Sequence, residues 1–252
     1  MSQQISPRSI SIFSPSESVA VEQHTSTPSV QRTVSGTATV EGRLTSPVAR
    51  VPAATEACGG ITVKGHTLKT FAYTTDAAVI RNTNANTILA VYPFTGEPVI
   101  TQALLTVAQQ PLFVGVGGGT TTGGRVIELA MVAEMQGAAG VVINAPAPAE
   151  TVEATMNAVD IPVIATVTND DTITEHKILA GAAIINVAAG ARTPEVVRSI
   201  RAHHPEVPIL ASGGASDESI TATIEAGADA VTWTPPSAQQ LQSQMMAKYR
   251  GD

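Results

Sequence analysis

Four polar side chains of this 252-residue chain follow short apolar runs and have the chemistry to move protons or to hold carbonyl and hydroxyl groups. Asp76 and Glu97 each come just after a predicted strand, where a carboxylate held against apolar walls suits general base work. Both also suit the first turn of a helix, where a carboxylate offsets the helix dipole. Asn144 and Asn186 each close a run of small apolar residues, so their amides need partners there. These amides either orient a substrate or bond each other and the backbone.

Two glycine-rich stretches are candidates for anion binding. The stretch GVGGGTTTGG at 115–124 allows positive φ and close approach of a ligand to the backbone, which predicts an anion cradle or a lid with glycine hinges. A flexible loop without a ligand is the alternative. The second stretch follows VPILA and precedes a predicted helix whose N-cap is Ser216, so its N–H groups are placed to bind an anion. The ligand-binding residues predicted from both stretches, with the loop before the last helix, are Gly117, Gly118, Gly119, Thr120, Ser212, Gly213, Gly214 and Ser237.

The elements that must position these residues alternate regularly from Thr67 onward. Eight apolar strand candidates are separated by helical patterns, and Gly-Ala phrases such as GAAGVVINA, GAAIINVAA and GADAVTWTP precede several strands. The count predicts an α/β fold, a (β/α)8 TIM barrel, with a doubly wound open parallel sheet as the alternative. The strands are expected at 68–74, 87–92, 112–116, 140–143, 161–167, 182–187, 207–211 and 230–233, and the helices at 76–82, 98–109, 124–136, 148–158, 171–179, 193–203, 216–226 and 237–249.

Residues 1–60 differ in composition from the predicted barrel at 61–252. Ser, Thr, Pro, Val and Gln dominate this Ser/Thr/Pro-rich N-terminal arm, and the stretch 33–43 alternates weakly, as in a short strand or hairpin. Two interpretations remain: a disordered or loosely packed arm, and a β-rich extension that packs on the barrel or on a second subunit.

The phrase VPILASGGASDESITATIEAGADAVTW at 207–233 resembles the closing half of the phosphate-binding (β/α)8 barrels, a superfamily that includes ribulose-phosphate and N-acetylmannosamine-phosphate epimerases and keto-deoxy-phosphogluconate aldolases. The resemblance implies that Gly213 and Gly214, with the loop after the eighth strand, hold a phosphate through backbone N–H groups. It covers the last third of the chain closely and residues 67–206 only as a strand–helix rhythm. The chain departs from the family after the eighth strand, where Pro235 and Pro236 remove two N–H donors and leave those of Ser237 and Ala238.

Composition narrows the range of partners and cofactors. A formal net charge of −7 argues against nucleic acid and anionic membranes as partners, and the N-terminus lacks the apolar core of a signal peptide, so a cytoplasmic protein is expected. Cys58 is the single cysteine and the histidines have no zinc-site spacing, so neither a metal nor another cofactor is predicted. No lysine ends the sixth predicted strand, which disfavours Schiff-base chemistry. A homo-oligomer is left open.

These observations lead to one main hypothesis for function and two alternatives. The main hypothesis is an enzyme that acts on a small phosphorylated metabolite by isomerisation, epimerisation or lyase chemistry through proton transfer. Asp76 or Glu97 would be the base, Asn144 and Asn186 would orient the substrate, and the glycine loops would hold its anionic ends. The alternatives are a non-catalytic barrel that binds a phosphorylated ligand, and a hydrolase.

Overall fold

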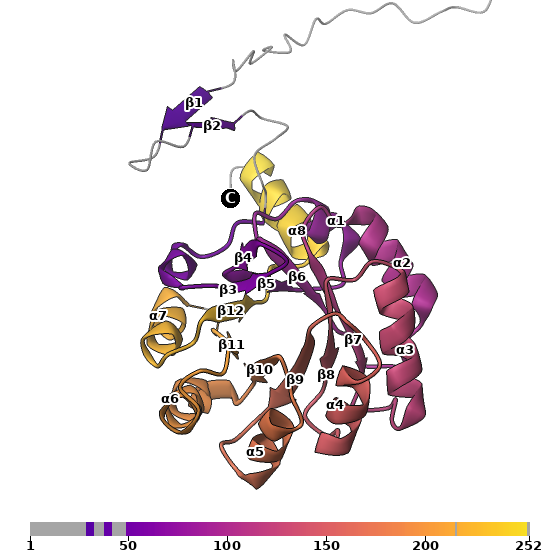
Figure 1. Cartoon of the computed structure of the whole chain (residues 1–252). Helices are drawn as coiled ribbons and strands as arrows, with labels where there is room; N and C mark the ends of the chain where they lie inside the picture. The colour runs from indigo at the N-terminus through magenta and orange to yellow at the C-terminus, as the bar shows by residue number, and fades with distance from the viewer. Residues whose placement is uncertain (1–28, 33–37, 42–48, 215, 251–252) are drawn as a thin grey trace, which may run out of the picture. The chain divides into compact units, whose positions relative to one another are not determined.

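The computed structural model describes residues 29–32, 38–41, 49–214 and 216–250 (Figure 1). The chain forms two compact units, Met1–Ser46 and Pro47–Asp252. In the first unit, β1 (Ser29–Arg32) pairs antiparallel with β2 (Ala38–Glu41). The remainder of the predicted arm before residue 49 lies outside the described residues.

Eight parallel strands of the second unit close into a barrel, in the order β10-β11-β12-β5-β6-β7-β8-β9. The (β/α)8 prediction is confirmed. The open-sheet alternative is wrong, because β9 pairs with β10 and β12 pairs with β5, which leaves the sheet without an edge. The strands are β5 (Thr70–Tyr73), β6 (Thr87–Ala90), β7 (Leu112–Gly117), β8 (Gly140–Ile143), β9 (Val163–Val167), β10 (Ile184–Val187), β11 (Ile209–Ser212) and β12 (Ala230–Trp233).

Helices follow the barrel strands and form the outer ring in Figure 1. Several end at a glycine with positive φ, as the sequence predicts, namely Gly137, Gly181 and Gly227. None of the helices in the described part of the chain is both long and apolar enough to span a membrane. The helices are α1 (Ala77–Arg81), α2 (Pro98–Val107), α3 (Gly124–Met135), α4 (Ala149–Met156), α5 (Thr172–Leu179), α6 (Thr193–His203), α7 (Asp217–Glu225) and α8 (Ala238–Arg250).

A short segment ahead of β5 packs on α7 through its 3-10 helix and on the amino end of the barrel through its hairpin. It contains the 3-10 helix η1 (Ala53–Ala57) and a hairpin of β3 (Ile61–Val63) and β4 (His66–Leu68). Ile61 and Leu68 of this hairpin join the cluster of side chains inside the barrel. The hairpin therefore closes the end of the barrel opposite to the carboxyl ends of the strands.

The barrel interior is filled by one apolar side chain from each strand. These residues form a cluster separate from the larger one between barrel and helices, and they are Phe71, Leu89, Phe113, Val142, Ile164, Ile184, Leu210 and Ala230. Because side chains alternate between the two faces of a strand, the residue two positions later also points inward, one level nearer the carboxyl end. That next level is Tyr73, Val91, Gly115, Asn144, Thr166, Asn186, Ser212 and Thr232, which is mostly polar.

Candidate functional site

A cavity of about 550 Å³ lies at the carboxyl ends of the strands, directly above the apolar interior. We call it the mouth cavity. Ligands of parallel barrels bind at this end, because the loops and strand ends there converge on one point. The lining residues are Tyr73, Leu89, Val91, Val142, Asn144, Thr166, Asn186, Ala188, Ser212, Gly214, Thr232 and Thr234. The structure thus brings together four of the sequence-predicted site residues, namely Asn144, Asn186, Ser212 and Gly214.

Asn186 is the polar side chain of this cavity with an unmet hydrogen bond. Its side chain is 7% exposed, and its Nδ2 donates to Thr166 Oγ1 at 3.2 Å. Its Oδ1 is buried and accepts no hydrogen bond from the described residues. A buried carbonyl without a donor is costly, and this oxygen can accept a hydrogen bond from an N–H or O–H group placed in the cavity.

Lys177 supports the same part of the site from behind. It lies on α5 with 1% of its surface exposed, and its Nζ donates to the carbonyl oxygens of Ala145 at 2.8 Å and Thr166 at 3.1 Å. The Lys177 amine therefore links Ala145, which follows Asn144, to Thr166, whose hydroxyl accepts a hydrogen bond from Asn186. Burial lowers the pKa of Lys177 below its ordinary value, although the charge of Asp171 acts in the opposite direction. The two carbonyl oxygens each accept one N–H of this amine.

The lowered pKa of Lys177 predicts a pH dependence of stability. Between that lowered pKa and the ordinary value of 10.5, the unfolded chain binds one proton more than the folded chain. The free energy of unfolding should therefore rise with pH through this window, and K177M should flatten the rise. Urea unfolding at several pH values from 7 to 10.5 measures this, with K64M at an exposed position as the control. Equal slopes for K177M and the wild type would contradict the prediction.

Asp76, predicted as a base, serves as a helix cap and does not line the mouth cavity. Its Oδ1 accepts the backbone N–H groups of Ala78 at 3.0 Å and Val79 at 3.3 Å, in the first turn of α1. Its Oδ2 accepts the N–H of Ala238 at 2.9 Å, at the start of α8. A carboxylate with three backbone donors is held in place by the two helices, so the capping alternative accounts for this residue.

Glu97, the other predicted base, also lies away from the mouth cavity. It is the N-cap residue of α2 and makes no side-chain capping bond. Its backbone N–H donates to the hydroxyl of Tyr92 at 3.1 Å, and its own side chain is exposed. The structure therefore brings neither predicted carboxylate to the two asparagines.

The backbone donors expected for a phosphate beside β11 and β12 are largely engaged within the protein. Gly213 N–H donates to Thr232 O at 3.1 Å, as part of the barrel. Ser237 N–H donates to Gln240 Oε1 at 2.8 Å, and Ala238 N–H is taken by Asp76. The carboxylate of Asp76 thus stands at the start of α8 where a ligand anion would bind. Gly214 remains at the edge of the mouth cavity.

The other glycine loop encloses a second cavity of about 160 Å³, which we call the loop cavity. Among its lining residues are Gly117, Gly119 and Thr120, all predicted ligand-binding residues. Gly118, at φ +100°, instead packs on the backbone of Asn144, where a Cβ would lie 2.6 Å from Asn144 O. Val91 and Asn144 line both cavities, so the loop cavity adjoins the mouth cavity.

The two cavities also contain polar groups beyond the predicted catalytic and ligand-binding residues. Tyr73, Thr166 and Thr232 line the mouth cavity, and Thr121 lines the loop cavity. Counting two residues onward from the inward apolar residue of each strand finds the first three. Lys177 has a weaker signal, since it lies three residues after buried Thr174 on the inner face of its helix. Within the described residues, no three His, Cys, Asp or Glu side chains gather to hold a metal ion.

No protein-family model matches the chain, and no curated protein matches it. Solved structures do match. A phosphoenolpyruvate phosphomutase from Streptomyces platensis subsp. rosaceus is 15% identical, with a TM-score of 0.55 over 73% of this chain and 81% of the other. A phosphonopyruvate hydrolase solved with oxalate and magnesium is 14% identical, with a TM-score of 0.54 over 73% and 80%. A mandelate oxidase variant with an FMN adduct is 18% identical, with a TM-score of 0.52 over 70% and 68%. At this level of identity the likenesses show the TIM-barrel fold alone, and they single out no phosphate-binding family.

Proposed function

We propose that the protein is an enzyme of the lyase or isomerase type that acts on a small phosphorylated metabolite bound in the mouth cavity. The observation that carries the proposal is the buried, unpartnered Oδ1 of Asn186 beside Thr166. A ligand hydroxyl or amine would supply the missing hydrogen bond, and Asn144 adds a second amide on the same wall. The solved phosphomutase and phosphonopyruvate hydrolase, which share the fold, agree with chemistry of this kind.

Tyr73 is the residue to which we assign proton transfer. It is the only ionisable side chain among the described residues that line the mouth cavity, and it is 42% exposed at the end of β5. Asp76 and Glu97 do not line this cavity, so the phenol of Tyr73 takes the role first expected of a carboxylate. In this proposal the amides of Asn144 and Asn186 hold the oxygen atoms of the substrate while Tyr73 exchanges a proton with it.

A non-catalytic barrel that binds the same class of ligand is the second candidate. The observation in its favour is that, within the described part of the chain, no Asp, Glu, His, Lys or Arg side chain lines the mouth cavity. Neutral amides and hydroxyls recognise a polar molecule well, but they make weak general acids and bases at neutral pH. Turnover of a bound ligand therefore separates the two candidates.

The test begins with a thermal-shift screen of phosphorylated and unphosphorylated sugars and keto acids, followed by NMR detection of turnover for each ligand found. N186L should weaken binding of that ligand tenfold or more, since about 1.4 kcal/mol corresponds to tenfold. The fold should tolerate this change, because leucine has a similar volume and removes the unpartnered oxygen. Y73F should retain binding and lower turnover about a hundredfold or more.

N157L is the matched control, because Asn157 is exposed at the end of α4 and lines neither cavity. Full turnover in Y73F would show that proton transfer is wrongly assigned. A ligand that binds tightly and is never converted would favour the binding barrel. Equal affinities for N186L and N157L would contradict the site itself.

A further inference from the structure

We propose that the loop between β7 and α3 is the oxyanion subsite of this protein, with Gly119, Thr120 and Thr121 as its donors. The inference rests on the proposed function and adds where the phosphate of the substrate binds. It moves the phosphate away from the β11 and β12 loops, where the sequence resemblance put it, to the loop cavity.

Thr121 provides the first observation. Its side chain is 5% exposed, it lines the loop cavity, and its Oγ1 has no hydrogen-bond partner among the described residues. A buried hydroxyl without a partner costs free energy in the unliganded protein. An oxyanion in the cavity would accept a hydrogen bond from this hydroxyl and remove that cost.

The backbone of the same loop provides the second observation. Gly118 N–H donates to Thr121 O at 2.9 Å, and this hydrogen bond closes the loop into a tight turn. The following N–H groups, of Gly119 and Thr120, have no acceptor among the described residues, and both residues line the loop cavity. Successive backbone N–H groups in such a turn form a concave site that favours anions.

Electrostatics around the loop also favour an anion. No carboxylate of the described residues lines the loop cavity. The loop runs into α3, a 12-residue helix that begins at Gly124. The helix has no side-chain cap and no acidic residue in its first turn, and the first turn contains Arg125. By contrast, α7 carries Asp217 and Glu218 in its first turn. The positive end of the α3 dipole is therefore not offset by a local carboxylate.

The size and position of the loop cavity fit a phosphate group that belongs to a larger molecule. Its volume of about 160 Å³ exceeds the roughly 30 Å³ that one water molecule occupies in the liquid. Asn144 and Val91 form the boundary with the mouth cavity. A substrate with its phosphate on the glycine loop would thus reach Asn186 with its organic part.

The test uses inorganic phosphate as the probe, measured by calorimetry and by amide shifts of the Gly119 loop in NMR spectra of the full chain. Phosphate should bind the wild type, G119D should abolish binding, and G119N should keep it within about threefold. A Cβ at Gly119 would meet no other atom within 4 Å, and its φ lies outside the left-handed region, so both variants should fold. This pair separates the effect of charge from the effect of adding a side chain.

T121V gives an independent readout. Valine has the shape of threonine without the hydroxyl, so phosphate binding should weaken about fivefold or more while the melting temperature stays the same or rises. N186L should leave phosphate binding unaltered, because inorganic phosphate has no organic part. A wild type that binds a mouth-cavity ligand but no phosphate overturns the subsite alone. Phosphate binding that G119D does not reduce overturns it as well, whereas phosphate binding without any mouth-cavity ligand overturns the proposed function alone.

Discussion

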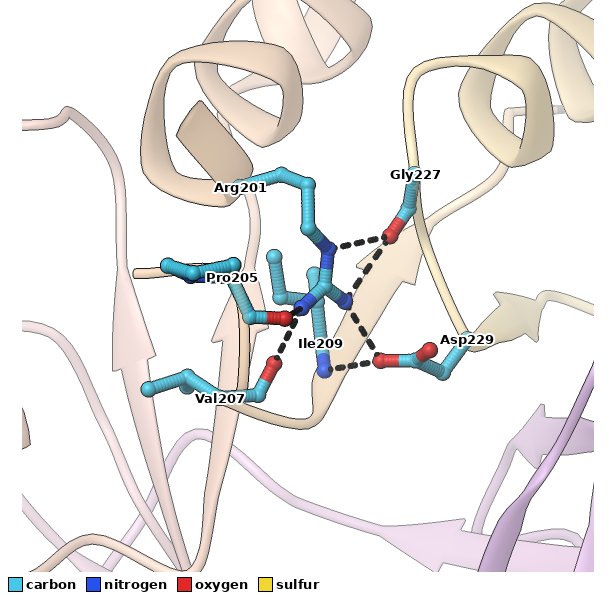
Figure 2. Close-up of polar contacts among 6 residues, drawn as sticks. All are labelled: Arg201, Pro205, Val207, Ile209, Gly227 and Asp229. Atoms are coloured by element: carbon cyan, nitrogen blue, oxygen red, sulfur yellow. Dashed lines mark hydrogen bonds and ion pairs between the residues drawn. The ribbon is translucent and has the colours of Figure 1, made fainter. Parts of the chain in front are cut away.

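R201L should lower the free energy of unfolding by about 2 to 4 kcal/mol, and R201K should recover only a small part of that loss. Arg201 lies on α6, and all five N–H groups of its guanidinium are used, as Figure 2 shows. They donate to the carbonyl oxygens of Pro205, Val207 and Gly227 and to Asp229 Oδ2, at distances from 2.6 to 3.2 Å. No ammonium group can reproduce this planar arrangement.

The loss should be large because R201L removes the guanidinium that pairs with Asp229 and leaves the Asp229 carboxylate without a cation. Asp229 Oδ2 also accepts Ile209 N–H at 2.7 Å, which fixes the amino end of β11. The pair is partly exposed, with side-chain exposures of 24% and 37%, so we expect less than the effect of breaking a fully buried ion pair. Urea unfolding and calorimetry measure the change, which corresponds to roughly 5 to 15 °C in melting temperature for a domain of this size.

R198K is the matched control for the Arg201 variants. Arg198 is on the same helix but exposed, so its change to lysine should alter the free energy of unfolding by less than about 0.5 kcal/mol. An equally small effect of R201K would show that the charge of Arg201 matters and its five hydrogen bonds do not.

G118A should cost about 2 to 4 kcal/mol of stability and weaken binding in both cavities at least tenfold. The residue has φ +100°, where an L-residue is strained, and its new Cβ would meet the O and N atoms of Asn144 at 2.6 and 2.8 Å. Backbone atoms cannot move aside as the end of a side chain can. The loop and the Asn144 segment would therefore separate, although Asn144 N–H donates to Gly117 O at 2.8 Å.

G119A, one residue later, is the control for G118A. Its Cβ would have no atom within 4 Å, so we expect less than about 1 kcal/mol of change and phosphate affinity close to that of the wild type. The comparison requires urea unfolding of both variants and a phosphate titration of each. If G118A binds phosphate and the mouth-cavity ligand normally, the coupling between loop and Asn144 that we infer does not exist.

The barrel was predictable from the sequence because its rules are local. Branched apolar runs, glycines after helices such as Gly137 and Gly227, and N-caps such as Ser216 each depend on a few neighbouring residues. Asn144 and Asn186 were predictable in the same way, since a polar residue at the end of a buried strand of a barrel must face the mouth or find a partner.

The loop on which we propose that the phosphate binds was less predictable, because an anion site depends on which donors are already engaged. Gly213, Ser237 and Ala238 have the residue types and the loop positions that the resemblance requires, yet each donates its N–H within the protein. Those partners are distant in sequence or depend on side-chain rotamers. The contacts of Lys177 are hard to predict for a similar reason, since helix spacing indicates that it faces inward but only packing shows that it reaches the carboxyl ends of β8 and β9.

The bond between Asp76 and Ala238 also bears on how the chain folds. The two residues that it joins are 162 positions apart in the sequence, and β5 likewise has no partner on one side until β12 is present. During synthesis from the N-terminus, Asp76 can cap α1 long before α8 exists, whereas its second oxygen is satisfied only when the last helix arrives. Closure of the barrel is thus a late, non-local event, of the sort that slows folding and leaves strand edges open in the meantime.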